Sequence, residues 1–236
     1  MLLGTLVAPG LPALGLAIAT FATFLARRPL RIAVADWRHD RRLTRTDVAA
    51  GSVVGLAVVA AAGLGLAVLT SSEPFWWPLL IAAPIVLVQL RLDLDNRGRE
   101  LLPELLGQIA LGAAAPMIIL AEGLSWQIAV GAWLVLAARI VPSVLLVRAQ
   151  LRRAKQRPFS VAPTTATGVV AVVIVALAGS MDWAPRLSAV AAVLLMAWDW
   201  ISMRRPPAAA KTLGWTQMVV GLVVVAAFAV GYHAGW

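Results

Sequence analysis

The stretch VAAGSVVGLAVVAAAGLGLAVLT, residues 48–70, decides the fold class, because it carries no charged side chain over a length that can cross a membrane. A helix needs about 20 mostly apolar residues to cross a bilayer. The stretch is continuously apolar and does not alternate between apolar and polar residues, as a strand of a membrane barrel would. Since backbone groups in lipid must bond within the protein, we predict a transmembrane helix here.

Similar segments recur along the 236-residue chain, which is 61% hydrophobic and has a mean hydropathy of +0.87. Soluble domains have about 45–50% apolar residues. The apolar segments are 2–8, 11–26, 48–70, 76–90, 105–120, 125–147, 166–180, 188–202 and 214–232. Several are shorter than a bilayer is thick, so we expect flanking residues to extend the helices. The prediction is an all-α, polytopic transmembrane helical bundle with eight full helices and a partial N-terminal one, forming a single integral membrane domain over residues 1–236.

Lysine and arginine residues gather on alternate connections between these segments. Nearly all of the 20 cations lie in 26–47, 91–104, 148–165 and 203–213, whereas the intervening connections contain only Arg186. Cytoplasmic loops of membrane proteins are enriched in such residues. We therefore predict a multi-pass protein of the bacterial inner membrane with these charged loops in the cytoplasm. The net charge of +9 is then explained by topology, and we expect no nucleic-acid partner.

The residue types that usually carry metal or thiol chemistry are scarce. The chain has no cysteine, so disulfide and thiol chemistry are excluded. Its two histidines, His39 and His233, are far apart in the sequence, and no metal-binding motif contains them.

The first charged connection, ARRPLRIAVADWRHDRRLTRTD, contains a pair of aspartates. Asp36 and Asp40 are four residues apart, so on a helix they share a face. Such a pair can hold Mg²⁺ that bridges to substrate phosphates, and Arg41 and Arg42 could bind the phosphate oxygens. The simpler alternative, which the sequence alone favours, is a cytoplasmic loop whose arginines set the topology and contact anionic lipids.

The second charged connection lies in VQLRLDLDNRGRELLPELLG, residues 88–107, on the same predicted side. Its candidate site residues are Asp93, Asp95, Arg97 and Arg99. Ionisable clusters at a membrane edge often mark functional sites. Glu100 and Glu104 also have a structural explanation, because acidic residues are favourable near a helix N-terminus.

Two charged residues fall inside or at the end of apolar segments. Arg139 is surrounded by apolar residues, where a charge is costly and usually faces the bundle interior. We expect it to pair with a carboxylate or a phosphate, the alternative being a side chain that extends to the nearby interface. Asp199 ends its helix against the helix dipole. We expect it to pair with Arg204, Arg205 or another helix.

Three segments carry a resemblance to known proteins: FLARRPLRIAVADWRHDRRLTRT, VQLRLDLDNRGRELLPELLGQIALGAAAP and ARIVPSVLLVRAQLRRA. In order and spacing they resemble the YwiC-like family of bacterial membrane proteins, over roughly residues 12–155. The chain is also distantly similar to the UbiA superfamily of intramembrane prenyltransferases, which have nine helices and polar cytoplasmic loops after helices 2, 4 and 6. This resemblance implies a UbiA-like nine-helix arrangement. YwiC-like proteins usually open with a Glu-His-Gly-Ala-Trp segment, so the start MLLGTLVAPG implies a truncated first helix.

The resemblance also implies a site for an isoprenoid diphosphate. Asp36 and Asp40 match part of the first Asp-rich motif, which binds diphosphate through Mg²⁺. The second such motif has no counterpart, because residues 142–158 contain no acidic side chain. This implies at most one metal ion, or arginines that hold the phosphates directly. The candidate metal ligands are Asp36, Asp40, Asp93 and Asp95. The candidate phosphate ligands are Arg41, Arg42, Arg97, Arg99 and Arg139.

Two functions therefore remain open at this point. The first is a membrane protein that binds or transfers an isoprenoid or other lipid diphosphate at its cytoplasmic loops, with Mg²⁺ as a possible cofactor and membrane lipids as partners. The second is a non-catalytic lipid-binding protein or a transporter on the same scaffold, because a fold does not determine a function.

Overall fold

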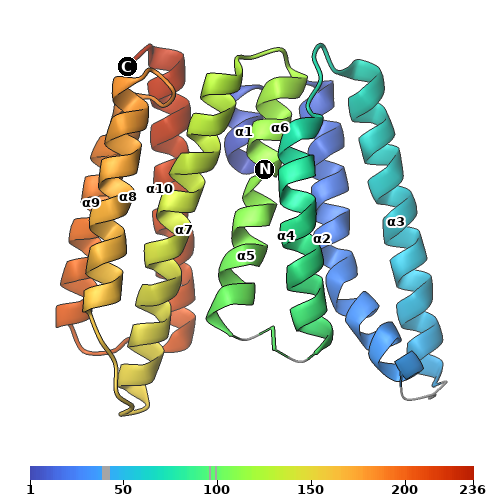
Figure 1. Cartoon of the computed structure of the whole chain (residues 1–236), viewed down its shortest axis with the longest axis horizontal. Coiled ribbons are helices and arrows are strands. Elements are labelled where there is room, and N and C mark those ends of the chain that lie inside the picture. The colour runs from blue at the N-terminus through green and yellow to red at the C-terminus, as the bar shows by residue number, and fades with distance from the viewer. Residues whose placement is uncertain (39–42, 96, 99) are drawn as a thin grey trace. The chain divides into compact units, whose positions relative to one another are not determined.

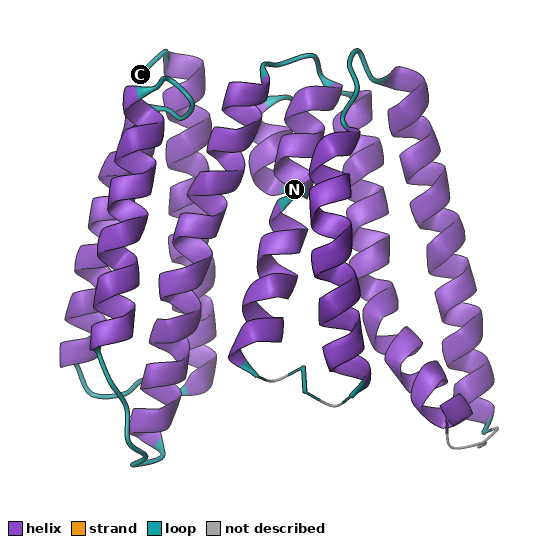
Figure 2. Cartoon of the chain, in the orientation of Figure 1, coloured by secondary structure: helices purple, strands orange, loops and turns teal. Residues whose placement is uncertain are grey.

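The computed structural model describes residues 1–38, 43–95, 97–98 and 100–236, and its regular structure there is entirely helical (Figure 2). The chain divides into two compact units, an N-terminal unit, Met1–Leu124, and a C-terminal unit, Ser125–Trp236. The single domain expected from the sequence stays a prediction.

The N-terminal unit contains helices α1 to α6 (Figure 1). Their bounds are α1 Leu2–Val7, α2 Leu11–Arg38, α3 Thr44–Thr70, α4 Trp76–Leu94, α5 Leu101–Gly112 and α6 Ala114–Ala121. The C-terminal unit contains α7 Trp126–Ala154, α8 Ala162–Ser180, α9 Arg186–Arg204 and α10 Ala210–Ala234.

The predicted set of membrane spans is confirmed by length and composition. Eight helical segments of the described chain are long and apolar enough to cross a bilayer, with α5 and α6 together forming one of them. The short α1 precedes them. Large apolar side chains face outward along these helices; Leu69 on α3, for example, is 86% exposed. In a bilayer, lipid would cover such side chains.

The helices extend beyond the apolar segments at the basic connections. Helix α2 continues to Arg38, whereas the apolar segment ended at residue 26, and α7 continues to Ala154. Much of the expected loop 26–47 is therefore helix. Arginine is a good helix former, and its long side chain can reach water from the end of a membrane helix. The predicted extension of short segments by their flanking residues is thus confirmed.

The span formed by α5 and α6 is broken at Ala113. Pro116 has no N–H and therefore cannot bond to the carbonyl of Gly112, four residues earlier. All eight residues of α6 are buried. Helix α1 packs against α6, and a Cβ on Gly4 would lie 2.9 Å from the Ala115 carbonyl oxygen.

Candidate functional site

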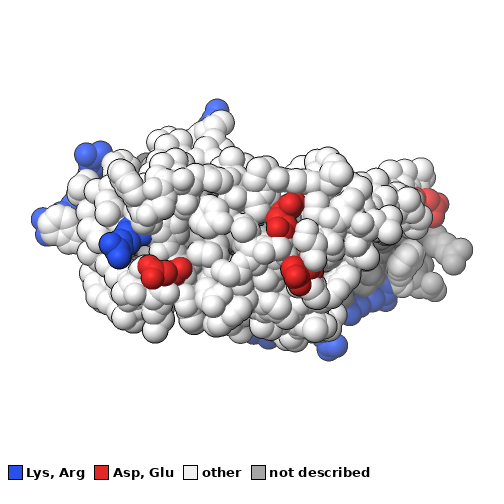
Figure 3. Space-filling model, turned by 90° about the horizontal axis from the view of Figure 1, so that it is seen from above, with Lys and Arg blue, Asp and Glu red and all other residues white. Residues whose placement is uncertain are grey.

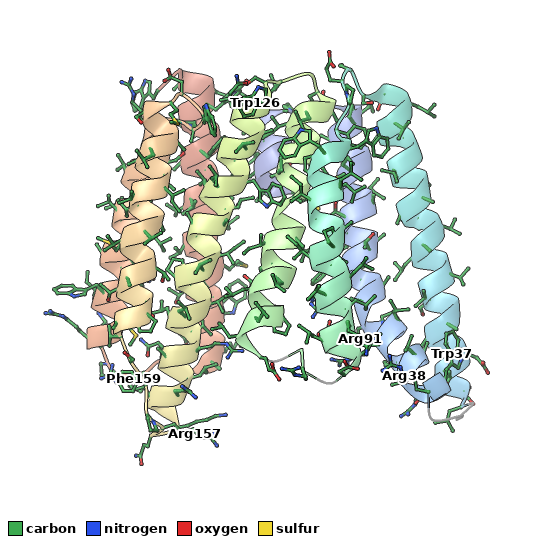
Figure 4. The ribbon with its side chains drawn as sticks, in the orientation of Figure 1. Trp37, Arg38, Arg91, Trp126, Arg157 and Phe159 are labelled. Carbon is green, nitrogen blue, oxygen red and sulfur yellow. The ribbon has the colours of Figure 1, made fainter. Side chains whose placement is uncertain are left out.

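The two charged connections of the N-terminal unit lie at the same end of it. Arg38 at the end of α2 reaches Asp95 beyond the end of α4, with Nη1 and Oδ1 3.6 Å apart. Figure 4 shows Arg38 and Arg91 at this end, together with Trp37. Their proximity agrees with the prediction that both connections lie on one side of the membrane.

Asp36 connects α2 to α3. Its side chain is nearly buried and accepts two hydrogen bonds from Arg45, from Nε at 3.0 Å and from Nη2 at 2.7 Å. Thr46 Oγ1 donates a further bond at 2.8 Å. A bidentate arginine–carboxylate contact has both strength and a defined geometry. Asp36 therefore ties the start of α3 to the end of α2.

Asp93 connects α4 to α2. Its side chain is 4% exposed, and Oδ2 accepts from Arg27 Nε at 2.6 Å. Gln89 lies one turn earlier on α4, and with its amide oxygen turned toward Arg27 it accepts from Nη2 at 2.6 Å. A Cβ on Gly107 would lie 2.8 Å from the Gln89 amide, so α5 packs directly on this cluster.

Other described charges of this end also form pairs. Asp95 accepts from Arg91 Nε at 3.2 Å. Arg97 donates to both carboxylate oxygens of Glu100, at 2.7 and 2.8 Å. The hydrogen bonds from Arg97 hold the pKa of the Glu100 carboxyl below its usual value. Arg97, predicted as a phosphate ligand, thus already has a carboxylate partner.

The predicted magnesium ligands are not brought together in the part of the chain that the structure describes. No group of three or more His, Cys, Asp or Glu side chains that could hold a metal occurs among the described residues. The carboxylates of Asp36 and Asp93 bind arginines from different helices. These two carboxylates therefore fit an ion-pair network better than a metal site. Four predicted site residues lie outside the described residues: Asp40, Arg41, Arg42 and Arg99.

The C-terminal unit has a second basic end, formed by residues 148–165 and 203–213. Arg153 Nη1 donates to the carbonyl oxygens of Met203, at 2.7 Å, and of Arg205, at 2.8 Å. A cation near the last carbonyls of a helix is favourable, and this one attaches α7 to the end of α9. Figure 4 shows Arg157 and Phe159 at this end and Trp126 at the opposite one.

This second basic end contains cations and no carboxylate within its two connections. Its cations are Arg148, Arg152, Arg153, Lys155, Arg157, Arg204, Arg205 and Lys211. In the space-filling view of Figure 3 most of the visible surface is uncharged, with a few separate acidic and basic patches.

A cavity of about 340 Å³ lies between α8 and α9 near this end. Its wall includes Thr164, Gly168, Met196, Asp199, Trp200 and Met203. The Arg204 guanidinium lies over the Trp200 ring, 3.4 Å from its centroid. Such a contact is attractive because the ring face is electron-rich. One cation is therefore held beside a side chain that lines the cavity.

Arg139 and Asp199 line a smaller pocket in the interior of the C-terminal unit. Arg139 Nη2 donates to the Gln217 carbonyl oxygen on α10. Asp199 is 4% exposed, and neither of its oxygens has a hydrogen-bond partner among the described residues. Arg139 and Asp199 form no direct ion pair within the described chain.

The expected pairing of Asp199 is not found among the described residues. Arg204 and Arg205 lie over Trp200 and Trp198, and neither they nor another helix donates a hydrogen bond to the Asp199 carboxylate. Sequence reasoning also missed Thr164, a polar cavity residue, because a threonine in the first turn of an apolar helix gives no functional signal by itself.

The comparison with known proteins concerns mainly the first half of the chain. No curated protein and no solved structure matches it. The model of the YwiC-like protein family matches residues 1–119, which include the arginine–carboxylate clusters at Asp36 and Asp93. Because this match covers half of the chain, the chain belongs to the YwiC-like protein family.

Proposed function

We propose that this YwiC-like, multi-helix membrane protein binds a lipid whose headgroup is a phosphate or diphosphate, of the isoprenoid diphosphate class. The headgroup binds on the cytoplasmic side at the basic end of the C-terminal unit, formed by residues 148–165 and 203–213. The observation that carries the proposal is the cavity of about 340 Å³ between α8 and α9, adjacent to a cluster of cations without a carboxylate in its connections.

The cations of this end can supply the headgroup contacts. Arginine binds phosphate oxygens in a bidentate manner and stays charged at any physiological pH. Each Lys or Arg near an anionic membrane surface contributes about 1 kcal/mol. Arg204 is held against Trp200, and Arg153 against two carbonyl groups, so these side chains are positioned before a headgroup arrives. Pre-positioned contacts favour binding because less side-chain freedom is lost.

An apolar path for the lipid chain continues from the cavity. Val169 lines the cavity and is 48% exposed, and further outward-facing apolar side chains follow it along the same two helices. These are Val170, Val173 and Leu177 on α8, and Val190, Val193 and Leu194 on α9. An isoprenoid or acyl chain could lie along this surface with its headgroup at the basic end.

Binding is better supported than metal-dependent transfer. In the N-terminal unit, Asp36 and Asp93 accept hydrogen bonds from arginines. Mg²⁺ at Asp36, Asp40, Asp93 and Asp95, prenyl transfer and the link to UbiA-like enzymes stay predictions. A transporter is the second candidate, because ionisable side chains inside a membrane, such as Arg139 and Asp199, often mark a transport pathway.

Native mass spectrometry of the purified protein tests the proposal. An isoprenoid diphosphate should remain bound, and the corresponding isoprenoid alcohol should bind at least ~10-fold more weakly, because two or more cation contacts of about 1 kcal/mol each are lost. Arg204→Gln should weaken diphosphate binding about fivefold, the equivalent of one such contact. The matched control is Arg186→Gln, since Arg186 is an exposed cation at the other end of α9. Equal binding of alcohol and diphosphate, or equal effects of the two substitutions, would refute the proposal.

A further inference from the structure

We propose that Asp199 and Thr164 form a binding site for a divalent cation, Mg²⁺, in the cavity between α8 and α9, and that this ion binds together with the phosphate groups of the lipid. The inference rests on the proposed function and assigns the ion to a site different from the aspartates of the N-terminal unit.

Three oxygen atoms with open hydrogen-bonding capacity carry this inference. Asp199 Oδ1 and Oδ2 and Thr164 Oγ1 are buried and have no hydrogen-bond partner among the described residues. Asp199 and Thr164 are each 4% exposed. The large majority of buried side-chain polar atoms in proteins are paired, and a buried carboxylate without a partner is costly. Such oxygens are the ligands that a hard cation prefers.

The two side chains face a common space from different helices. Thr164 comes from α8 and Asp199 from α9, and both line the cavity of about 340 Å³. One water takes ~30 Å³ of liquid volume, so this space can hold several waters. Mg²⁺ retains waters and binds through one or two carboxylates together with substrate phosphates. The cavity therefore accommodates a partly hydrated ion.

The nearby arginines do not satisfy Asp199. Arg139 donates to the Gln217 carbonyl, and Arg204 lies over Trp200. In this respect Asp199 differs from Asp36 and Asp93, whose carboxylates accept from arginines at 2.6–3.0 Å. Its oxygens thus have no hydrogen-bond partner among the described residues, in a side chain that lines the cavity.

Charge balance explains why the ion should bind with a phosphate group. Mg²⁺ alone would be repelled by Arg139 and by the cations of the basic end. A lipid phosphate or diphosphate brings two or three negative charges, which with Asp199 balance Mg²⁺ and Arg139 to near neutrality. Buried charges persist when they are paired in this way. Binding of the ion and of the phosphate group should therefore be cooperative.

The proposed cation site lies close to the ends of α8 and α9, at the level where a lipid headgroup would lie. Asp199 precedes the last residue of α9, Arg204, by about 8 Å along the axis, at ~1.5 Å per residue. Thr164 lies within the first turn of α8. The ion would therefore sit close to the membrane surface and not at its centre.

Equilibrium dialysis of the full chain in detergent tests the site directly. Mn²⁺ replaces Mg²⁺ as the detectable ion, and inorganic pyrophosphate serves as the headgroup probe. The wild type should retain Mn²⁺ in excess of the surrounding Mn²⁺–pyrophosphate solution, and Mg²⁺ should displace it. Without pyrophosphate the excess should fall at least ~10-fold, because one carboxylate and one hydroxyl bind Mg²⁺ weakly without phosphate oxygens.

Substitutions assign the ion to its ligands. Asp199→Asn should reduce the excess at least ~10-fold and Thr164→Val several-fold, since each removes an oxygen ligand. The matched control is Asp182→Asn: Asp182 is exposed, and its φ of 58° suits asparagine as well as aspartate. Size-exclusion elution and thermal denaturation confirm that each variant is folded. No excess in the wild type, or an excess unchanged in both Asp199→Asn and Thr164→Val, would overturn the inference.

A parallel lipid measurement separates this inference from the proposed function. If the isoprenoid diphosphate binds through Arg204 equally well in EDTA and in Mg²⁺, the proposed function stands and the cation site is refuted. If Asp199 retains Mn²⁺ with pyrophosphate while the protein does not distinguish the diphosphate lipid from the alcohol, the cation site stands and the proposed lipid is refuted.

Discussion

Asp93 has 4% of its side chain exposed, while Arg27, which it binds, has 42% exposed. This difference makes the pair asymmetric. If Asp93 is replaced, the Arg27 guanidinium can turn into water. If Arg27 is replaced, the Asp93 carboxylate stays buried without its cation. A charge left unpaired in the interior is the main cost of breaking such a pair. The same reasoning applies to Asp36, whose cation Arg45 is also exposed.

We expect Arg27→Gln to destabilise the protein by ~3 kcal/mol and Asp93→Asn by about 1 kcal/mol, because only the first leaves a buried unpaired charge. The double variant should be more stable than Arg27→Gln alone. Thermal denaturation in detergent, compared across the three variants, measures this order. A larger loss for Asp93→Asn than for Arg27→Gln would contradict the argument.

Helices α2 and α3 pack through small residues. A Cβ on Gly15 would lie 2.5 Å from the Gly63 carbonyl oxygen, and one on Gly63 would lie 2.7 Å from the Gly15 carbonyl oxygen. Ala67 and Ala19 follow four residues later on the two helices and contact the same positions. Small residues at this spacing let the backbones of membrane helices approach closely. The helix pair that carries Asp36 and Arg45 is held together by this contact.

Gly63→Leu should lower the stability of the protein by about 1–3 kcal/mol, because the added side chain forces the two backbones apart. Gly65→Leu is the matched control, since a Cβ on Gly65 has no atom within 4 Å. The control should be neutral or slightly stabilising, as glycine is about 1 kcal/mol less favourable than alanine in a helix. The melting temperatures of the two variants in detergent measure this difference. An equal decrease of the melting temperature in both variants would disprove close packing at Gly63.

For the whole molecule, the order of the candidate spans and the charges of the connections predict the same membrane topology. Eight helical segments of the described chain are candidate spans, and if each crosses the membrane, successive connections alternate between its two sides. The cations lie almost entirely in every second connection. This pattern is the positive-inside distribution. The proposed lipid and cation sites both depend on it, because they require the basic ends to face the cytoplasm.

Reporter fusions at successive connections test this topology. Fusions after Arg97 and Arg157 should report the cytoplasm, and fusions after Gly123 and Asp182 should report the opposite side. One candidate span lies between each of these positions and the next along the chain, so each step changes the side of the membrane. A phosphatase reporter active outside and a fluorescent reporter active inside give complementary signals. Finding Arg97 and Gly123 in the same compartment would contradict the assigned spans.

Patterns along the chain were sufficient to predict the helical class, the eight spans and the grouping of the cations. Apolar length and loop charge are local properties, and a bilayer responds to them without any knowledge of tertiary contacts. The break before Pro116 also has a local cause, the missing N–H of proline.

Tertiary structure alone decided which carboxylates accept hydrogen bonds from an arginine and which have no partner among the described residues. In the sequence, Asp36, Asp93 and Asp199 are alike, since each precedes arginines near the basic end of a helix. Asp93 finds its cation 66 residues away on another helix, whereas Asp199 lies against a cavity where no described side chain donates to it. Helix packing sets these distances, and the interaction of two charges depends on their separation in space and on their burial, which a linear pattern does not contain.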